Sequence, residues 1–444
     1  MKSSLLVPSL AALSLAACVH FQPRPLSPDA SSASFTGRSL GDAGLKSFLA
    51  EQHAGSTWTV DKLALAAAYF HGDVKVAQAM ADEAAAGITT AAQRPNPVLS
   101  FSPGYNSTSK GISPWIIFPS VDVPIETAGK RGKRIAFAEA EVESAKLMVA
   151  AAGWDARNKV RKAMLDVYAG RENATLLKAE IALHDEALTK LSAQVKAGEA
   201  PAFELTTARL SLNRSKLALH DAEKKSSTAM AQLASAVGVP SSALETVPLD
   251  FSSFESFPDA PGNAARRNAL THRSDLLAAL AGYKAAEATL RLEIAKQYPD
   301  VHLGPGYELD QGDNKWHIGL SIDLPILNQN KGPIAQAEAK RKTAAAKFEA
   351  KQAAVFGEIE AALVSYRAAQ AKATTAAQLA DEAAHASDTT KRMVEAGELG
   401  ALELVRRRIE ASASTLSRLE SRLQAQEAIG QLEAALQLPL RSVK

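Results

Sequence analysis

The chain has 444 residues, with 50 lysines and arginines against 48 acidic residues, and aromatic side chains make up only 5% of it. Its formal net charge of +2 argues against a nucleic-acid-binding protein. Because Cys18 is the only cysteine, an intrachain disulfide is excluded, and no second thiol is present for catalysis or metal binding. Abundant alanine and scarce aromatic residues are typical of helices packed closely along their length.

The N-terminus predicts an exported, lipid-modified protein. Lys2, an apolar run over residues 5–13 and small residues before Cys18 have the layout of a signal peptide. The stretch 15–18 (LAAC) resembles a bacterial lipobox, which implies removal of residues 1–17 and attachment of lipid, palmitate included, to Cys18. Val19 in place of aspartate favours the outer membrane, by resemblance to enterobacterial sorting. An ordinary secretory signal with a chance cysteine is the alternative.

Four short segments alternate between apolar and polar residues and predict β-strands. The first two cover about 97–105 and 114–124, where prolines interrupt the alternation, and the second two cover 301–310 and 316–324. The polar residues between the strands of each pair, 106–113 and 311–315, predict hairpin loops. About nine to eleven residues suffice for a tilted membrane-spanning strand. Four residues would then lie in aromatic girdles: Tyr105, Trp115, Tyr307 and Trp316.

Long intervals without proline follow each strand pair and predict long helices. Residues 127–194 would extend for roughly 100 Å as one helix, and the interval after Pro333 predicts a counterpart. Gly198 and Gly397 end these helices, and a second helix follows each glycine. Apolar residues at intervals of seven predict side-by-side packing of neighbouring helices: Phe203, Leu210 and Leu217, and then Leu402, Ile409, Leu416 and Leu423.

The two halves of the chain repeat one unit. Residues 135–140 (IAFAEA) return as 334–339 (IAQAEA), and residues 195–199 (VKAGE) return as 394–398 (VEAGE) at the same spacing. In the strand regions, 103–105 (PGY) return as 305–307 with the spacing altered by only a few residues. Matches at one spacing over such a length indicate an internal duplication of a strand pair and a helical hairpin.

A four-stranded sheet cannot close into a barrel by itself, and an open sheet edge is not viable inside a membrane. If these segments cross a membrane, the chain must therefore oligomerise, and three copies would supply twelve strands. The alternative is a four-stranded sheet in a periplasmic protein. Beyond the signal, no stretch of eighteen apolar residues predicts a transmembrane helix.

The order of strand pair, long hairpin, linker, strand pair and long hairpin resembles the TolC-type outer-membrane efflux proteins over about residues 58–440. The stretch 123–131 (VPIETAGKR) is similar to the heavy-metal resistance branch of RND systems, which covers cobalt–zinc–cadmium and copper–silver resistance. The resemblance implies a mainly α fold with a β membrane part, in which a homotrimer forms a twelve-stranded β-barrel and a twelve-helix α-barrel. It implies the following division: a lipoprotein signal peptide (1–17), an N-terminal lipidated extension (18–56), a first efflux repeat (57–240), an inter-repeat equatorial segment (241–262) and a second efflux repeat (263–440).

By this resemblance the protein is not an enzyme and needs no cofactor. It would be the outer-membrane exit duct of a tripartite pump in a Gram-negative bacterium, with its helices in the periplasm. The implied partners are a periplasmic adaptor, an inner-membrane RND pump and outer-membrane lipid, with no nucleic acid. Heavy-metal cations are the implied cargo, with drugs or polypeptides of type I secretion as alternatives. A periplasmic adaptor or coiled-coil protein is a further alternative, although an adaptor would carry one hairpin with lipoyl-like β halves. No catalytic motif supports a secreted hydrolase.

The implied site residues lie at the hairpin tips. The resemblance places adaptor docking at Gly198, Glu199, Gly397 and Glu398. It places a periplasmic gate just beyond the second tip, at Glu403 and Arg406. Arg406 departs from the acidic pattern of related channels, and a ring of arginines in a trimer would repel cations. Alternatively, Glu403 and Arg406 could pair with each other on one solvated helix face.

Two other sets of polar residues are candidates for a site. The basic residues 130–134 (KRGKR) could bind anionic headgroups or lipid-anchored neighbours, or form an ordinary solvated helix start. The nine histidines have no zinc-site spacing, so no metal site is predicted. His302 and His317 could face a pore lumen, where polar residues are expected.

Overall fold

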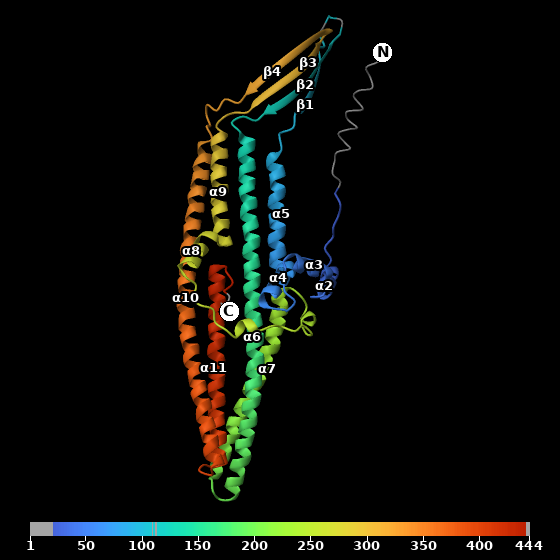
Figure 1. Cartoon of the computed structure of the whole chain (residues 1–444). Helices are drawn as coiled ribbons and strands as arrows, with labels where there is room; N and C mark the ends of the chain where they lie inside the picture. Colours follow the sequence, from blue (N-terminus) through green and yellow to red (C-terminus); the bar gives the residue numbers. More distant parts are fainter. Residues whose placement is uncertain (1–20, 109, 112, 441–444) are drawn as a thin grey trace.

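The computed structural model describes residues 21–440 except 109 and 112, so Cys18 lies outside the described residues. A four-stranded sheet occupies one end of an elongated molecule, and two long helical hairpins run from it to the opposite end (Figure 1). Short helices and the linker between the two halves lie about midway along the long axis. None of the described helices is both long and apolar enough to span a membrane. The predicted fold class, mainly α with four strands in each chain, is confirmed.

Each half of the chain contains the same six elements in the same order. The first half has α4 (Val60–Phe70), α5 (Gly72–Ala92), β1 (Val98–Tyr105), β2 (Trp115–Ile125), α6 (Lys130–Lys196) and α7 (Ala202–Val237). The second half has α8 (Asn263–His272), α9 (Ser274–Ala295), β3 (Val301–Asp310), β4 (Asp313–Ile322), α10 (Lys331–Glu395) and α11 (Ala401–Leu436). Two helices, α2 (Pro28–Thr36) and α3 (Ala43–Glu51), precede the first half, and two 3-10 turns, Ser241–Ala243 and Ser252–Phe254, lie between the halves.

The strands form one antiparallel sheet in the order β1-β2-β3-β4. Pro103 and Pro119 remain within their strands, opposite Ile117 and Phe101, so the prolines do not end the pairing. The predicted loop over 311–315 is too long, because β4 already begins at Asp313. Its turn consists of Gln311 and Gly312, which both have positive φ, 53° and 111°. Two residues of that geometry match the twist of a tight hairpin.

Each long helix ends at a glycine with positive φ, as predicted. Gly198 has φ 78° and Gly397 has φ 80°, and nothing lies within 4 Å of the position that a Cβ would take in either. The amides of the following residues close the helix ends, Glu199 onto the Gln194 carbonyl and Glu398 onto the Met393 carbonyl, each at 2.9 Å. This left-handed ending satisfies carbonyls that the helix leaves free, and it reverses the chain into α7 or α11.

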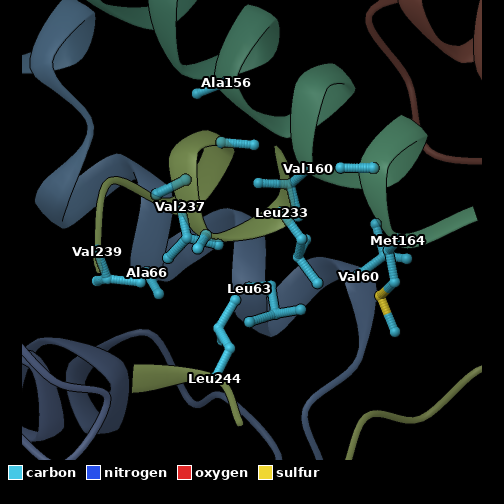
Figure 2. Close-up of a cluster of buried hydrophobic side chains, with 14 of the residues drawn as sticks. Val60, Leu63, Ala66, Ala156, Val160, Met164, Leu233, Val237, Val239 and Leu244 are labelled. Atoms are coloured by element: carbon cyan, nitrogen blue, oxygen red, sulfur yellow. The ribbon is translucent and has the colours of Figure 1, made fainter. Parts of the chain in front are cut away.

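The largest apolar core lies near the middle of the molecule rather than at either end. It joins α4, α6 and α7 through side chains that are almost completely buried, with Leu244 of the linker beneath them (Figure 2). The residues that meet there include Leu63, Val160, Met164, Leu233 and Val237. A second cluster joins α10 to α11 through Val355, Ile359, Leu363, Tyr366 and Leu432. These two cores fix both hairpins at this level, which we call the equator.

The segment before the first half is part of the equatorial packing. Arg38 donates to the carbonyls of Gly238 at 2.8 Å and of Phe70 at 3.3 Å, which end α7 and α4. Gly238 has φ 85°, and a Cβ there would approach the Phe70 backbone at 2.9 Å. Position 238 therefore requires glycine on two counts. The α5 and α9 helices, by contrast, had not been predicted as separate elements.

Candidate functional site

One face of the four-stranded sheet is almost entirely apolar and open to the surroundings. Paired residues of an antiparallel sheet share a face, so the register of the strands assigns each side chain. The exposed fractions of Phe101, Trp316, Ile318 and Leu320 are 63%, 82%, 82% and 66%. Two aromatic pairs occur on this face near the hairpin ends, each with ring centroids 5.1 Å apart: Tyr105 with Trp115, and Tyr307 with Trp316.

The opposite face of the sheet carries mainly polar and small residues, together with Ile116 and Phe118. His302 lies 2.9 Å from Asp122, and His317 lies 2.8 Å from Glu308, so both histidines contact carboxylates on this face. Several glycines and serines share the face with them. Among the described residues, no group of three or more histidine, cysteine, aspartate or glutamate side chains could hold a metal ion. The sheet thus separates an apolar side from a hydrophilic side.

The basic run 130–134 connects the sheet to the helices. Lys130 Nζ lies 2.7 Å from Asp300 Oδ1, and the Asp300 carboxylate also accepts from the Thr127 amide at 2.9 Å. Arg131 Nε donates to the Ala92 carbonyl at the end of α5 at 2.7 Å. Arg134 pairs with Glu126 and donates to the carbonyl that follows α5. The run is therefore not an ordinary solvated helix start, because its side chains bind groups of the chain itself. Binding of anionic headgroups or lipid-anchored neighbours stays a prediction.

The two hairpin tips lie side by side at the end farthest from the sheet (Figure 1). Each tip presents an exposed glycine and glutamate, Gly198 and Glu199 on the first hairpin and Gly397 and Glu398 on the second. The structure brings these predicted docking residues together at one end of the molecule. It assigns no partner to them.

Arg406 joins the two hairpins just above the tips. Its Nη2 lies 3.0 Å from Glu204 Oε2 in the first turn of α7, just past the tip of the other hairpin. Glu403 instead pairs with Arg407 at 3.3 Å on its own helix. The expectation that Glu403 pairs with Arg406 is therefore wrong, because Arg406 reaches across to the first hairpin. Glu204 was missed, although it occupies in the first repeat the position that Glu403 occupies in the second.

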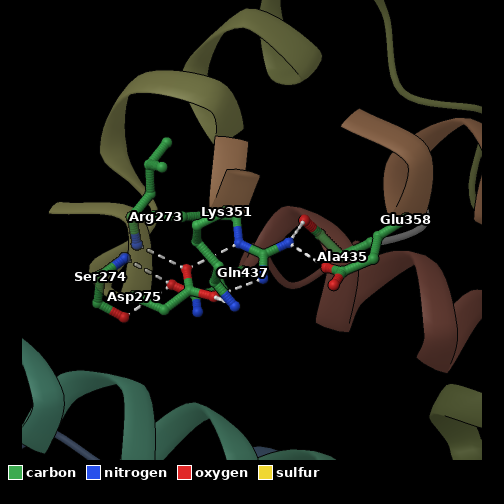
Figure 3. A network of polar contacts seen from close by, with 8 residues as sticks. Arg273, Ser274, Asp275, Lys351, Glu358, Ala435 and Gln437 are labelled. Atoms are coloured by element: carbon green, nitrogen blue, oxygen red, sulfur yellow. Dashed lines mark hydrogen bonds and ion pairs between the residues drawn. The ribbon is translucent and has the colours of Figure 1, made fainter. Parts of the chain in front are cut away.

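A network of charged residues ties the second half together at the equator. Arg273, between α8 and α9, contacts Glu358 of α10, the Ala435 carbonyl of α11 and Asp275, each at 2.8 Å (Figure 3). Lys351 of α10 also lies 2.8 Å from Asp275. Burial alone would raise the pKa of Asp275, but hydrogen bonds and ion pairs with Arg273 and Lys351 outweigh it and lower the pKa to about 2.

A second charged cluster joins the two halves and is more deeply buried. Glu433 of α11 accepts from Arg157 at 2.9 Å and lies 3.1 Å from Arg161 Nε, both on α6. Arg161 also donates to the Gln426 carbonyl at 2.8 Å, and Arg157 reaches Asp61 at 3.1 Å. Burial lowers the pKa of Arg161, while Glu433 raises it. This cluster anchors α11 on α6 at the equator, whereas the ion pair that joins the two hairpins near the tips, Arg406–Glu204, is exposed.

Comparisons with known proteins agree with this architecture. A family model described as outer membrane efflux protein matches residues 67–239 and 265–437. The cobalt-zinc-cadmium resistance protein CzcC of Cupriavidus metallidurans is 26% identical over 219 residues, which are 49% of this chain and 52% of that protein. The match thus spans about half of the curated relative.

Solved structures share the fold at low sequence identity. The outer-membrane channel OprN has a TM-score of 0.71 at 15% identity, with 94% of this chain and 98% of that chain covered. CusC has a TM-score of 0.70 at 16% identity, with 95% and 99% covered. VceC from Vibrio cholerae has a TM-score of 0.68 at 18% identity, with 86% and 97% covered.

Proposed function

The chain belongs to the outer membrane efflux protein family, and from that premise we propose that it forms the outer-membrane exit duct of a tripartite efflux pump. The observation that carries the proposal is the sheet, whose apolar face is exposed over the length of its strands. A soluble protein seldom leaves so large an apolar surface in water. In a bilayer the same surface would face lipid, and the polar side with His302 and His317 would face the aqueous path.

The proposed assembly is a homotrimer. Within one chain β1 and β4 are the edges of the sheet, and membrane-embedded edges must be paired. The apolar stripe of α7 is likewise uncovered, with exposed fractions of 70%, 53% and 66% at Phe203, Leu210 and Leu217. Three copies would pair the sheet edges into a barrel and would cover these stripes in a tunnel of helices.

The tips are the proposed docking and closing end of the duct. Their exposed turns, at Gly198, Glu199, Gly397 and Glu398, are the surface that a periplasmic adaptor would meet, with an RND pump beyond it. We assign the gate to Arg406 and Glu403. The exposed Arg406–Glu204 pair supports this role, because an exposed ion pair stabilises a contact by less than about 1 kcal/mol and separates readily.

Divalent heavy-metal cations are the proposed cargo, since CzcC is named for resistance to cobalt, zinc and cadmium. The duct itself would perform no catalysis and hold no cofactor, and cargo would diffuse through it. Cells that carry the matching pump and adaptor should tolerate zinc or cobalt only when this chain is present. Unchanged metal tolerance together with lost tolerance to a drug would assign an organic cargo instead.

The proposed location is the outer membrane of a Gram-negative bacterium, with lipid on Cys18 and the helices in the periplasm. Residues 1–17 are the proposed signal peptide and 18–56 the lipidated extension. The two repeats, 57–240 and 263–440, flank the equatorial segment 241–262. Mass spectrometry of the mature N-terminus would test the lipid on Cys18, because a plain secretory signal would leave that thiol unmodified.

Membrane fractionation distinguishes two hypotheses about this protein: a channel whose sheet lies in the membrane, and an adaptor anchored only by lipid. The decisive variant is Cys18→Ser, exported through an ordinary signal peptide. If the sheet lies in the bilayer, this variant remains in the outer-membrane fraction and needs detergent for extraction. Release of the folded variant into the soluble periplasmic fraction would overturn the channel and favour the adaptor.

A further inference from the structure

Two histidines lie on the polar face of the sheet, and each contacts a carboxylate of the neighbouring strand. His302 of β3 contacts Asp122 of β2 through Nδ1 at 2.9 Å, and His317 of β4 contacts Glu308 of β3 through Nε2 at 2.8 Å. The histidine side chains are 37% and 44% exposed, so solvent reaches both rings. Both pairs are therefore accessible from the side of the sheet that is proposed to face the aqueous path.

Each histidine uses only one of its two ring nitrogens in these contacts. Among the described residues, Nε2 of His302 and Nδ1 of His317 make no hydrogen bond or ion pair. A neutral imidazole that donates one ring N–H to a carboxylate keeps a lone pair on its other nitrogen, and metal-binding histidines are usually oriented in this way. Asp122 and Glu308 thus hold the two imidazoles in a form that can accept a cation.

The internal duplication indicates that the strands do not need these histidines in order to pair. His302 has a serine as its strand partner and His317 has a glycine. Ser100 and Ile116 occupy the same positions in the first hairpin, where they also have a serine and a glycine as partners. The first hairpin therefore forms the same antiparallel pairing with no histidine at either position.

Negative charge surrounds the histidine nearer the helices. Asp300 and Asp323, beside the ends of β3 and β4, act electrostatically on His302 together with Asp122. Lys130 neutralises Asp300, to which it is paired at 2.7 Å. Asp323 is exposed and makes no hydrogen bond or ion pair among the described residues. A negative potential at this end of the sheet would raise the local concentration of cations beside the imidazole.

The pair nearer the hairpin turn has a basic neighbour. Lys315 is the strand partner of Glu308, but its ammonium group forms an ion pair with Asp310. The positive charge of the lysine is therefore compensated within the sheet. An unpaired lysine does not oppose the approach of a cation to His317.

The two histidines lie at different depths along the strands. His317 lies opposite Gly306, which is four residues beyond His302 on β3. At 3.3 Å per residue the two levels are about 13 Å apart. The histidines thus form two successive contacts along the polar face rather than one common site.

We propose that His302 and His317 are successive contacts for borderline divalent cations, such as Zn²⁺ and Co²⁺, that move along the polar face. Imidazole nitrogen suits these ions, whereas Mg²⁺ prefers oxygen ligands. A structural zinc site has four ligands, and no group of three or more histidine, cysteine, aspartate or glutamate residues in the described part of the chain could hold a metal ion. One imidazole beside a carboxylate binds weakly, as conduction requires of an ion that must also leave. The inference rests on the proposed channel and names the residues that meet its cargo.

Block of the potassium current by zinc tests this proposal. The full-length protein is placed in planar bilayers in potassium chloride, and the concentration of Zn²⁺ or Mg²⁺ that halves the conductance is measured. The test variant is His302→Ser/His317→Ile, because Ser100 and Ile116 show that these strand positions accept both residues. We expect Zn²⁺ to act on the wild type at concentrations at least about tenfold lower than Mg²⁺, and the test variant to lose this difference.

The matched control is His220→Ala. His220 is another histidine near a carboxylate, 3.9 Å from Glu223, but it lies on α7 and is 77% exposed. Its substitution should leave the zinc response unchanged. Equal zinc responses of the wild type and the test variant, with conductance present in both, would overturn the histidine contacts and leave the channel in place. Equal potencies of Zn²⁺ and Mg²⁺ on the wild type would assign the block to carboxylates and also overturn the proposal.

The visible absorption of Co²⁺ gives a readout that does not need an open pore. Imidazole nitrogen changes the absorption bands of Co²⁺ from those of the hydrated ion. The same proteins in detergent are titrated with Co²⁺, and we expect a smaller spectral change in the test variant than in the wild type or in His220→Ala. No such difference would overturn the histidine contacts. A clear difference from a folded, trimeric protein that never conducts would support the contacts and overturn the proposed channel.

Discussion

The buried carboxylate of Glu433 provides the strongest test of how the two halves are held together. Its side chain is only 4% exposed, and it balances Arg157 and Arg161, whose side chains are 13% and 8% exposed. Glu433→Gln keeps the shape of the side chain but removes its charge. The two buried guanidinium groups then have only one carboxylate near them, that of Asp61, which pairs with Arg157 and is 55% exposed. Breaking a buried pair in this way costs about 3–5 kcal/mol.

Chemical denaturation of the detergent-solubilised protein, followed by circular dichroism, would measure this loss in the free energy of unfolding. Glu358→Gln is the matched control, because Glu358 is 48% exposed and its loss leaves Arg273 paired with Asp275; we expect a cost below about 1 kcal/mol there. The double substitution Arg161→Met/Glu433→Leu removes one charge of each sign and leaves Arg157 on Asp61. It should therefore be more stable than Glu433→Gln alone. A loss below 1 kcal/mol for Glu433→Gln would refute the reasoning.

Three further predictions concern pH, the tips and the core. The pKa of Asp275 is about 2 in the folded chain against an ordinary 3.8, so its contribution of about 2 kcal/mol is present above pH 4 and is lost as the pH falls toward 2. Asp275→Asn should flatten this part of a stability–pH curve, and an unchanged curve would contradict the ion-pair account. Arg406→Ala removes one exposed pair of about 0.5 kcal/mol from each of three copies, which should raise the open-to-closed ratio in single-channel records about tenfold. Arg407→Ala, whose partners lie on its own helix, should leave that ratio unchanged, and equal effects of the two variants would remove Arg406 from the gate. Leu63→Ala should cost about 2–5 kcal/mol of unfolding free energy, because Leu63 is completely buried. Leu217→Ala should weaken the trimer with little effect on the fold of one chain, and the opposite pattern would contradict the proposed helix contacts.

Features that depend on local chemistry were predictable from the sequence. Gly198 and Gly397 predict the left-handed conformation in which the two long helices end. The alternation of Trp316, Ile318 and Leu320 with polar residues predicts a strand with one apolar face. The tight turn at Gln311 was missed, because a glutamine at positive φ is not signalled by its own residue type. The polar residues after it, Asp313 to Lys315, belong to the strand but resemble a loop.

Contacts between distant segments were harder to predict. The ion pair of Arg406 depends on how the two hairpins pack against each other. The sequence does not show this packing, so Glu403, on the same helix as Arg406, was as good a candidate partner as any residue of the other hairpin. The repeat did contain a signal, because Glu204 occupies the position of Glu403 in the first half. Arg38 shows the opposite case. No spacing in the sequence connects it to the end of α7, and only the folded chain brings it to the Gly238 carbonyl.

Single-channel recording of the purified wild-type protein in planar bilayers tests the central claim most directly. We expect a small conductance that is closed most of the time, because the Arg406–Glu204 pair in each copy holds the two hairpin tips together. Absence of any conductance from a protein shown to be folded and trimeric would contradict the proposed channel.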